Sequence, residues 1–221
     1  MRATRAWLAA RVGRMDFAHV VAGLVAPPLC AVCGRGCRAE AVLCTRCSRV
    51  LAAARPVLSG GPQGIDRAWS SAPHDGVARS LVGALKFRRL LPVAGVMAER
   101  MHWLVPSHLL GGAVVPVPAA PPRLRRRGFD PAGELAAALA VRLEVPVEAC
   151  LVRRGSGHQV GRRRAERIRH PPRIEAIAEA PRSVLLVDDV LTTGATLTAC
   201  ASALRGAGVR RIVALTFTRR L

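Results

Sequence analysis

The stretch from Val184 to Thr196, VLLVDDVLTTGAT, constrains the fold of this chain more than any other. Its first four residues are aliphatic without a polar interruption, which is typical of a strand buried on both faces of a parallel sheet. We expect this strand to end on the acids Asp188 and Asp189. Hydroxyl residues around Gly194 follow, and then a helix whose apolar residues recur at i, i+3, i+4 and i+7. The sequence therefore predicts a strand, an acid pair, a small polar loop and a helix in direct succession.

The loop between this strand and helix has the composition of an anion-binding site. Backbone N–H groups of a tight Thr/Gly loop and the positive end of the helix dipole together favour a phosphate. Thr192, Thr193 and Thr196 add hydroxyl donors, and the two acids suit a sugar diol or a hydrated Mg²⁺. Open α/β sheets bind ligands at this edge. The alternative is a buried strand that enters a solvated turn, with Thr196 as an ordinary helix cap.

Two C-x-x-C pairs separated by ten residues predict a metal site near the N-terminus. Cys30, Cys33, Cys44 and Cys47 can place four thiolates in a tetrahedron, the usual arrangement of structural zinc. So short a segment has little core, so metal binding would supply its folding free energy. The alternative is a loop with free thiols, and the sequence leaves the role of Cys37 open. The remaining two cysteines, Cys150 and Cys200, lie in apolar patterns and are expected to pack in the core.

The composition limits the classes of function. A hydrophobic content of 51% fits a globular protein, and the formal net charge of +20 calls for anionic partners such as nucleic acid, polyphosphates or acidic proteins. Only 3% of the residues are aromatic, which weakens any case for single-strand binding by base stacking. No run of eighteen apolar residues occurs, so no membrane span is expected. Clustered cysteines without a secretory signal predict a cytoplasmic, reducing location.

The chain divides into three expected parts. Residues 1–25 form an amphipathic helical segment, residues 26–58 the four-cysteine module, and residues 65–221 an α/β domain. Within that domain helices are expected at 76–88, 92–104 and from residue 131, and strands at 113–117, 145–152, 184–187 and 211–218, the last closing the sheet. Strands that alternate with helices predict a parallel sheet flanked by helices.

Positive charge is concentrated between residues 123 and 173, where 13 arginines face 5 acidic residues. Its middle, from Arg153 to Arg169, contains glycines and runs of arginine. A structureless stretch of this length is a functional lid or disorder. Lys86, the only lysine of the chain, is a candidate phosphate contact, with a solvated helix end as the alternative.

Several motifs together resemble the ComF family of competence-associated proteins, which combine a zinc ribbon with a type I phosphoribosyltransferase-like domain. The Val184–Thr196 string resembles the motif with which such enzymes bind 5-phosphoribosyl-1-pyrophosphate (PRPP). The other matching pieces are the cysteine pairs, the Leu85-Lys86-Phe87 helix end, Val115-Pro116-Val117-Pro118, Arg127-Gly128-Phe129, and Gln159 with Arg164 and Arg167. The resemblance covers the chain from about Pro27 onward.

The resemblance implies roles for individual residues. Asp188 and Asp189 would hold the ribose hydroxyls, and the loop from Thr192 through Thr193, Gly194 and Ala195 to Thr196 would hold the 5-phosphate. Val117 and Pro118 would face the pyrophosphate with Mg²⁺. The remaining pyrophosphate and lid residues would be Lys86, Arg127, Gln159, Arg164 and Arg167. A structural Zn²⁺ would occupy the cysteine module.

Two functions remain open at this stage. The first is a Mg²⁺-dependent phosphoribosyltransferase that acts on PRPP and an unidentified acceptor, in a context of competence and DNA uptake. The second is a non-catalytic accessory of DNA uptake that binds single-stranded DNA or a DNA-uptake protein and keeps the PRPP site only for a regulatory ligand.

Overall fold

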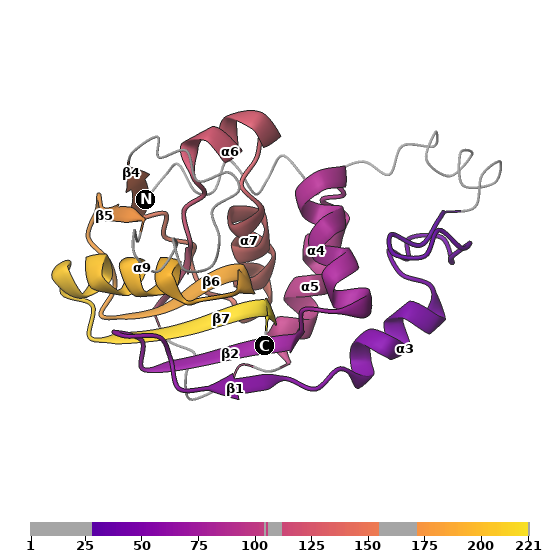
Figure 1. Ribbon diagram of the computed structural model, residues 1–221, viewed down its shortest axis with the longest axis horizontal. Coiled ribbons are helices and arrows are strands. Elements are labelled where there is room, and N and C mark those ends of the chain that lie inside the picture. Colours follow the sequence, from indigo (N-terminus) through magenta and orange to yellow (C-terminus); the bar gives the residue numbers. More distant parts are fainter. Residues whose placement is uncertain (1–27, 104, 106–111, 155–171, 221) are drawn as a thin grey trace.

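The computed structural model describes residues 28–103, 105, 112–154 and 172–220. Five strands form the main sheet, in the order β1-β2-β7-β6-β3. They are β1 (Val57–Ser59), β2 (Arg67–Pro73), β7 (Arg211–Arg219), β6 (Ser183–Leu191) and β3 (Ala113–Pro116). All neighbouring strands are parallel except β1 and β2, which form an antiparallel hairpin. The predicted α/β fold with a mostly parallel sheet is confirmed (Figure 1).

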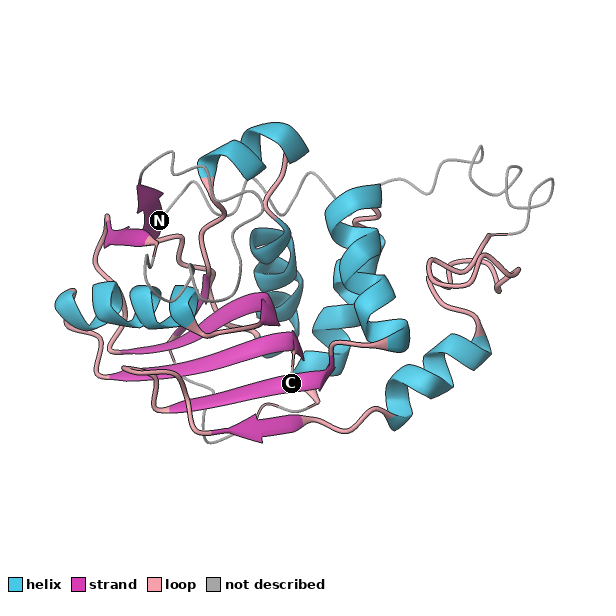
Figure 2. Cartoon of the chain, viewed as in Figure 1, coloured by secondary structure: helices cyan, strands magenta, loops and turns pink. Residues whose placement is uncertain are grey.

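Helices cover both faces of this sheet (Figure 2). One face is covered by α4 (Gly76–Arg88), α5 (Pro92–His102) and α7 (Pro131–Leu143). The other face is covered by α9 (Ala195–Gly206) together with a small hairpin of β4 (Leu151–Arg154) and β5 (Arg173–Ala176). The short helix α6 (Pro121–Arg127) follows β3.

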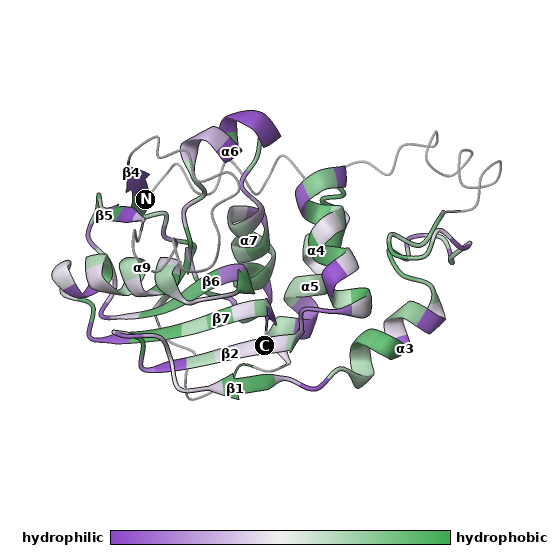
Figure 3. Ribbon diagram, in the orientation of Figure 1, coloured by the Kyte–Doolittle hydropathy of each residue, from purple (hydrophilic) through white to green (hydrophobic). Residues whose placement is uncertain are grey.

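The strand β6 shows how the sequence produces these layers. Leu185 and Val187 belong to the hydrophobic cluster on the α4, α5 and α7 side, whereas Val184 and Leu186 belong to the cluster on the α9 side. Alternate side chains of a strand point to opposite faces, so a strand covered on both sides needs apolar residues at every position. Figure 3 shows much of β6 and β7 in green and β2 mostly pale, while α6 is largely purple.

Three details of the predicted strands were wrong. The strand β6 does not end at the acids but continues to Leu191, because its pairing with β7 continues through Thr218 and Arg219. The last strand does not close the sheet, since β7 lies between β2 and β6.

The third error concerns residues 145–152. Pro146 has no N–H group and interrupts a ladder. Only one isolated bridge joins this segment to β3, through Val114 and Val147, and regular strand structure begins at Leu151 in the β4–β5 hairpin.

The cysteine-containing segment lies beside α4 and leads into α3 (Thr45–Ala53) (Figure 1). Ala31 and Leu51 are buried in the same cluster as α4 and α5. Arg88 donates to the carbonyl oxygen of Ala31, and Arg100 donates to that of Ala54. The segment therefore docks on the helices by both apolar and polar contacts. The division of the chain at residues 58 and 65 stays a prediction, and the segment 1–25 lies outside the described residues.

Candidate active site

The two acids of β6 lie on opposite faces of the strand where it reaches the edge of the sheet. Asp189 has the parity of Leu185 and Val187 and points to the α4 side, where Lys86 Nζ lies 2.6 Å from its Oδ1. Asp188 has the opposite parity and points to the α9 side. Both line one cavity, so a ligand at this edge meets a carboxylate from each side.

Lys86 and Asp189 form a largely buried ion pair. The side chain of Asp189 is 6% exposed and that of Lys86 is 21% exposed. A buried carboxylate needs a partner, because removing one charge of such a pair leaves the other uncompensated. The only lysine of the chain therefore lines the cavity as part of a buried ion pair and is not a solvated helix end.

The environment of Asp188 raises the pKa of its carboxyl strongly. Burial raises its pKa, and the negative charge of Asp189 raises it further, to about 8, against the opposing effect of Lys86. The backbone N–H of Asp189 donates to Asp188 Oδ1 at 2.8 Å and also favours the ionised form. This carboxyl is therefore largely protonated near neutral pH.

The threonine loop leads directly into α9, as the sequence predicts. Gly194 has φ +78° and precedes Ala195, the first residue of the helix. A side chain at this position would be strained by the backbone, and its Cβ would lie 2.8 Å from Pro62 Cγ. The first N–H groups of α9 have no partner within the helix. Thr192, Thr193 and Thr196 line the cavity around them, which makes an anion-binding loop.

The cavity has a volume of about 370 Å³, which lies in the range of small-molecule sites. It brings together most of the residues that the sequence analysis selected. These are Lys86, Val117, Pro118, Arg127, Asp188, Asp189, Thr192, Thr193, Ala195 and Thr196. Gly194 shapes the loop without lining the cavity, and Gln159, Arg164 and Arg167 lie outside the described residues.

Several other residues that line the cavity were not among the predicted site residues. They are His74, Arg123, Asp130 and Arg220, together with Phe87 of the Leu85-Lys86-Phe87 motif and Arg153 at the start of the basic segment. Five cations, counted over Lys86 and the lining arginines, face three carboxylates in the lining, so the cavity attracts a polyanion. Asp130 had a recognisable role as the helix cap of α7, since its Oδ1 accepts from Ala132 N at 3.1 Å. His74 and Arg220 follow strands β2 and β7, and only the sheet order brings them here.

Arg127 contributes a partly buried guanidinium group. Its Cζ lies 5.5 Å from the ring centroid of Phe87, an aromatic side chain at the end of α4. Burial lowers the pKa of Arg127, with a further contribution from Arg123. Its buried Nε has no hydrogen-bond partner within the described part of the chain. A cation that is already partly desolvated binds an anionic ligand at a smaller further cost.

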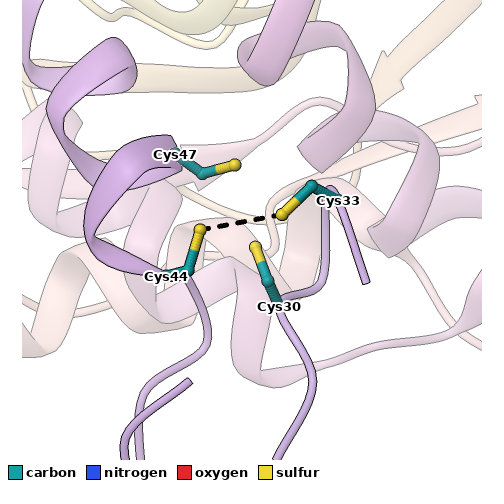
Figure 4. A group of neighbouring side chains, drawn as sticks. All are labelled: Cys30, Cys33, Cys44 and Cys47. Atoms are coloured by element: carbon teal, nitrogen blue, oxygen red, sulfur yellow. Dashed lines mark hydrogen bonds between the residues drawn. The ribbon is translucent and has the colours of Figure 1, made fainter. Parts of the chain in front are cut away.

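The four paired cysteines converge in space, as predicted. The Sγ atoms of Cys30, Cys33, Cys44 and Cys47 all lie within 4.8 Å of one another, and those of Cys33 and Cys44 are 3.6 Å apart (Figure 4). A tetrahedral zinc with bonds of about 2.3 Å needs sulfur atoms about 3.8 Å apart. The arrangement therefore fits a four-thiolate metal site. Cys37 is not a member of this cluster.

Local backbone structure prepares these thiols. The N–H of Gly34, which has φ +70°, donates to the carbonyl oxygen of Cys30 and closes the first turn. The second pair begins α3, with Cys44 at its N-cap. Burial acts to raise the pKa of Cys30, but N–H groups of the two C-x-x-C turns lower it to about 6. Cys150 and Cys200 are buried in the core, as expected.

Two carboxylates and a threonine loop meet at the carboxyl edge of the sheet, in a cavity whose groups suit a phosphate and a diol. The family described as phosphoribosyl transferase domain matches residues 124–221, which include the acid pair and the threonine loop. The match lies in the second half of the chain. None of the helices in the described ranges has the length and apolar character needed to cross a membrane.

Two solved structures are similar to the chain. Orotate phosphoribosyltransferase from Aeropyrum pernix shares 23% identity over 77% of this chain and 78% of that one, with a TM-score of 0.36. Glutamine PRPP amidotransferase from B. subtilis, in complex with ADP and GMP, shares 19% identity over 55% of this chain, with a TM-score of 0.37. The match spans only 25% of the amidotransferase. No curated protein matches the chain.

Proposed function

We propose that this protein binds PRPP with Mg²⁺ and transfers the phosphoribosyl group to an acceptor. The observation that carries the proposal is that the acid pair and the threonine loop open into one cationic cavity. Asp188 and Asp189 would accept hydrogen bonds from the ribose hydroxyls, and the loop before α9 would hold the 5-phosphate. Val117 and Pro118, which directly follow β3, the strand next to β6, would face the pyrophosphate.

The cavity supplies what loss of pyrophosphate requires. The bond from the anomeric carbon to the pyrophosphate oxygen breaks, and negative charge collects on the leaving group. Arg123 and Arg127 line the cavity beyond the turn after β3 and are suited to that charge, because guanidinium groups bind phosphates bidentately. The main contributions of the protein would be positioning and charge neutralisation.

Both metals fit the donor atoms that the chain provides. Carboxylate and hydroxyl oxygens in the cavity are the ligands that Mg²⁺ prefers, and Mg²⁺ would neutralise the pyrophosphate. The four thiolates suit a structural Zn²⁺, since they leave no open coordination position. Clustered thiols also fit a reducing compartment, and we place the protein in the cytoplasm on that ground. The resemblance to ComF adds competence and DNA uptake as the proposed context.

Titration calorimetry with PRPP tests this function directly. PRPP is expected to bind in the presence of Mg²⁺ and much more weakly with EDTA, because its phosphates need the metal's charge. Saturating PRPP and Mg²⁺ should also raise the melting temperature, since a ligand that binds only the folded state stabilises it by about 2.7 kcal/mol at 100 times its Kd. The absence of PRPP binding at any Mg²⁺ concentration would refute the proposal.

A second candidate function is nucleic-acid binding. It is favoured by the charge of +20 and by the exposed arginines of α6, Arg123, Arg125 and Arg126. If these arginines bind DNA phosphates, affinity for a thymidine oligonucleotide should fall by a factor of ten or more between 50 and 200 mM salt, with about 0.7 counterions released per contact. Changing Arg125 and Arg126 to glutamine should reduce that salt slope and leave PRPP affinity unchanged. An affinity independent of salt would exclude this function.

A further inference from the structure

A second cavity, of about 510 Å³, lies beside the main cavity and shares His74 and Arg220 with it. Arg79 and Arg219 also line it, and Asp75 is its only acidic lining residue. Within the described part of the chain, the guanidinium groups of Arg79, Arg219 and Arg220 form no hydrogen bond or ion pair with a side chain. Three arginines and one aspartate therefore line a cavity that adjoins the main one.

The sheet order places the second cavity and the turn after β3 on opposite sides of β6. The acid pair lies on β6, the pyrophosphate turn follows β3 on one side of it, and β7 and β2 lie on the other side. Arg220 directly follows β7, and His74 directly follows β2. In a displacement at the anomeric carbon, the incoming atom and the leaving group lie on opposite sides of that carbon. If pyrophosphate leaves toward the turn after β3, the acceptor approaches from the side of His74.

A hydrogen bond orients the imidazole of His74. Its Nδ1 lies 2.8 Å from the hydroxyl of Thr218, which also lies 3.3 Å from the backbone oxygen of Asp189. In the Nδ1–H tautomer the imidazole donates to Thr218, the hydroxyl donates to Asp189, and the lone pair on Nε2 can accept a proton. Nε2 has no hydrogen-bond partner among the described residues.

The surrounding charges keep this imidazole neutral. Burial lowers the pKa of His74, and Arg220 together with Lys86 and Arg79 from α4 lowers it further, while only Asp189 on β6 acts in the opposite direction. A neutral imidazole near pH 7 can take up a proton as the bond to the anomeric carbon forms.

We propose that the second cavity binds the acceptor, a small molecule with an anionic group next to its nucleophilic atom, and that His74 is the general base. The inference rests on the proposed function. The nucleophilic atom forms a bond to the anomeric carbon while the C–O bond to pyrophosphate breaks and the electron pair leaves with pyrophosphate. The proton of the nucleophile passes to His74 Nε2. Arg79, Arg219 and Arg220 hold the anionic group of the acceptor.

Benzoate and benzamide test the charge preference, because they have nearly the same shape and differ in charge. Protein saturated with PRPP and Mg²⁺ is titrated with each by calorimetry, and benzoate is expected to bind at least tenfold more tightly. The double change Arg79→Gln and Arg219→Gln should remove that preference, whereas Arg49→Gln, an exposed arginine of α3, should not. Equal binding of the two probes would overturn the proposal, as would displacement of benzoate by a thymidine oligonucleotide.

The change His74→Asn tests the general base, since asparagine can keep a hydrogen bond to Thr218 but cannot take up the proton. With water as acceptor, the rate of pyrophosphate release should fall about 100-fold, and the acidic limb of its pH profile should disappear. PRPP affinity, measured in the same variant, should change by less than about threefold. An undiminished rate with an intact acidic limb would refute the role of His74 while PRPP binding still stands. Failure of the wild-type protein to bind PRPP would instead refute the proposed function.

Discussion

Replacing Asp188 by asparagine is expected to raise the melting temperature of the ligand-free protein and to abolish PRPP binding. The folded protein holds Asp188 at a pKa of about 8, against an ordinary value of 3.8, because of burial and the neighbouring charge of Asp189. Asparagine keeps an oxygen for the N–H of Asp189 but carries no charge to bury. It can no longer accept two hydrogen bonds from the ribose as a carboxylate does. The negative charge that ligand binding requires at this position therefore destabilises the folded protein.

The pH dependence of this effect follows from the raised pKa. Below about pH 4 the carboxyl is protonated in the folded and unfolded states and has no influence on stability. Between about pH 4 and pH 8 the unfolded chain loses the proton while the folded protein keeps it, so the free energy of unfolding falls as the pH rises. Above about pH 8 both states are ionised and the loss is complete. The advantage of the asparagine variant should grow through this window and then remain constant.

Thermal unfolding of both proteins between pH 5 and pH 9 measures this prediction. The variant should melt at least about 3 °C above the wild type at pH 9, with a smaller difference at pH 5. Glu179→Gln, which removes an exposed carboxylate, is the matched control and should follow the wild type. A variant that melts at or below the wild-type temperature at pH 9 would show that Asp188 is not held protonated.

Ligand binding should show the opposite dependence on pH. A carboxylate that binds the ribose must first lose its proton, and the phosphates of PRPP are already ionised above pH 7. Wild-type affinity for PRPP and Mg²⁺ should therefore rise from pH 7 until about pH 8 and then level off. Asp188→Asn should show no PRPP binding over the same range.

The sequence predicted the parts of the site that are contiguous in the chain. The acids of β6, the threonine loop and the start of α9 lie within thirteen residues, so their mutual position follows from local geometry alone. The cysteine pairs are similar, because each C-x-x-C turn places two thiols by itself. The α/β class was also predictable, since an aliphatic strand with no polar position must be covered on both faces.

Residues that long-range pairing brings to the site were not predictable in this way. The strand β2, with the sequence RAWSSAP, has no aliphatic run and was not recognised. It lies in the sheet because its small residues pack closely and because Ser70 Oγ and Thr216 Oγ1 share a hydrogen bond of 2.6 Å. Without β2 in the sheet there is no reason to place His74 near Asp189. The ion pair of Lys86 with Asp189 could not be predicted for the same reason, because 103 positions separate the two residues.

Replacing Cys44 by serine is expected to remove bound zinc and to unfold the cysteine module. The wild-type protein should contain about one zinc per chain. In a module with so few buried residues, metal binding supplies most of the folding free energy, so three thiolates and a hydroxyl will not hold it. Metal analysis of reduced protein should show zinc falling to a small fraction of the wild-type content. Proteases should then cleave between residues 28 and 53.

Cys37→Ser is the matched control for this change. Cys37 lies between the two cysteine pairs, but its Sγ contacts the carbonyl oxygen of Arg35 and is not part of the four-sulfur cluster. Its replacement should leave both the zinc content and the protease pattern unchanged. Equal zinc loss in the two variants would contradict the assignment of the four ligands, and zinc-free wild-type protein would contradict the metal site itself.

The cysteine module should also influence the proposed PRPP site, because α4 contacts both. Arg88 donates to the carbonyl oxygen of Ala31 in the module, and the two residues before it, Lys86 and Phe87, line the main cavity. Unfolding the module removes that contact and frees the end of α4, and so weakens the position of the lysine that pairs with Asp189. Cys44→Ser should therefore reduce PRPP affinity, though less than Asp188→Asn, whereas Cys37→Ser should not. Unchanged PRPP affinity in zinc-free protein would show that α4 keeps its position without the module.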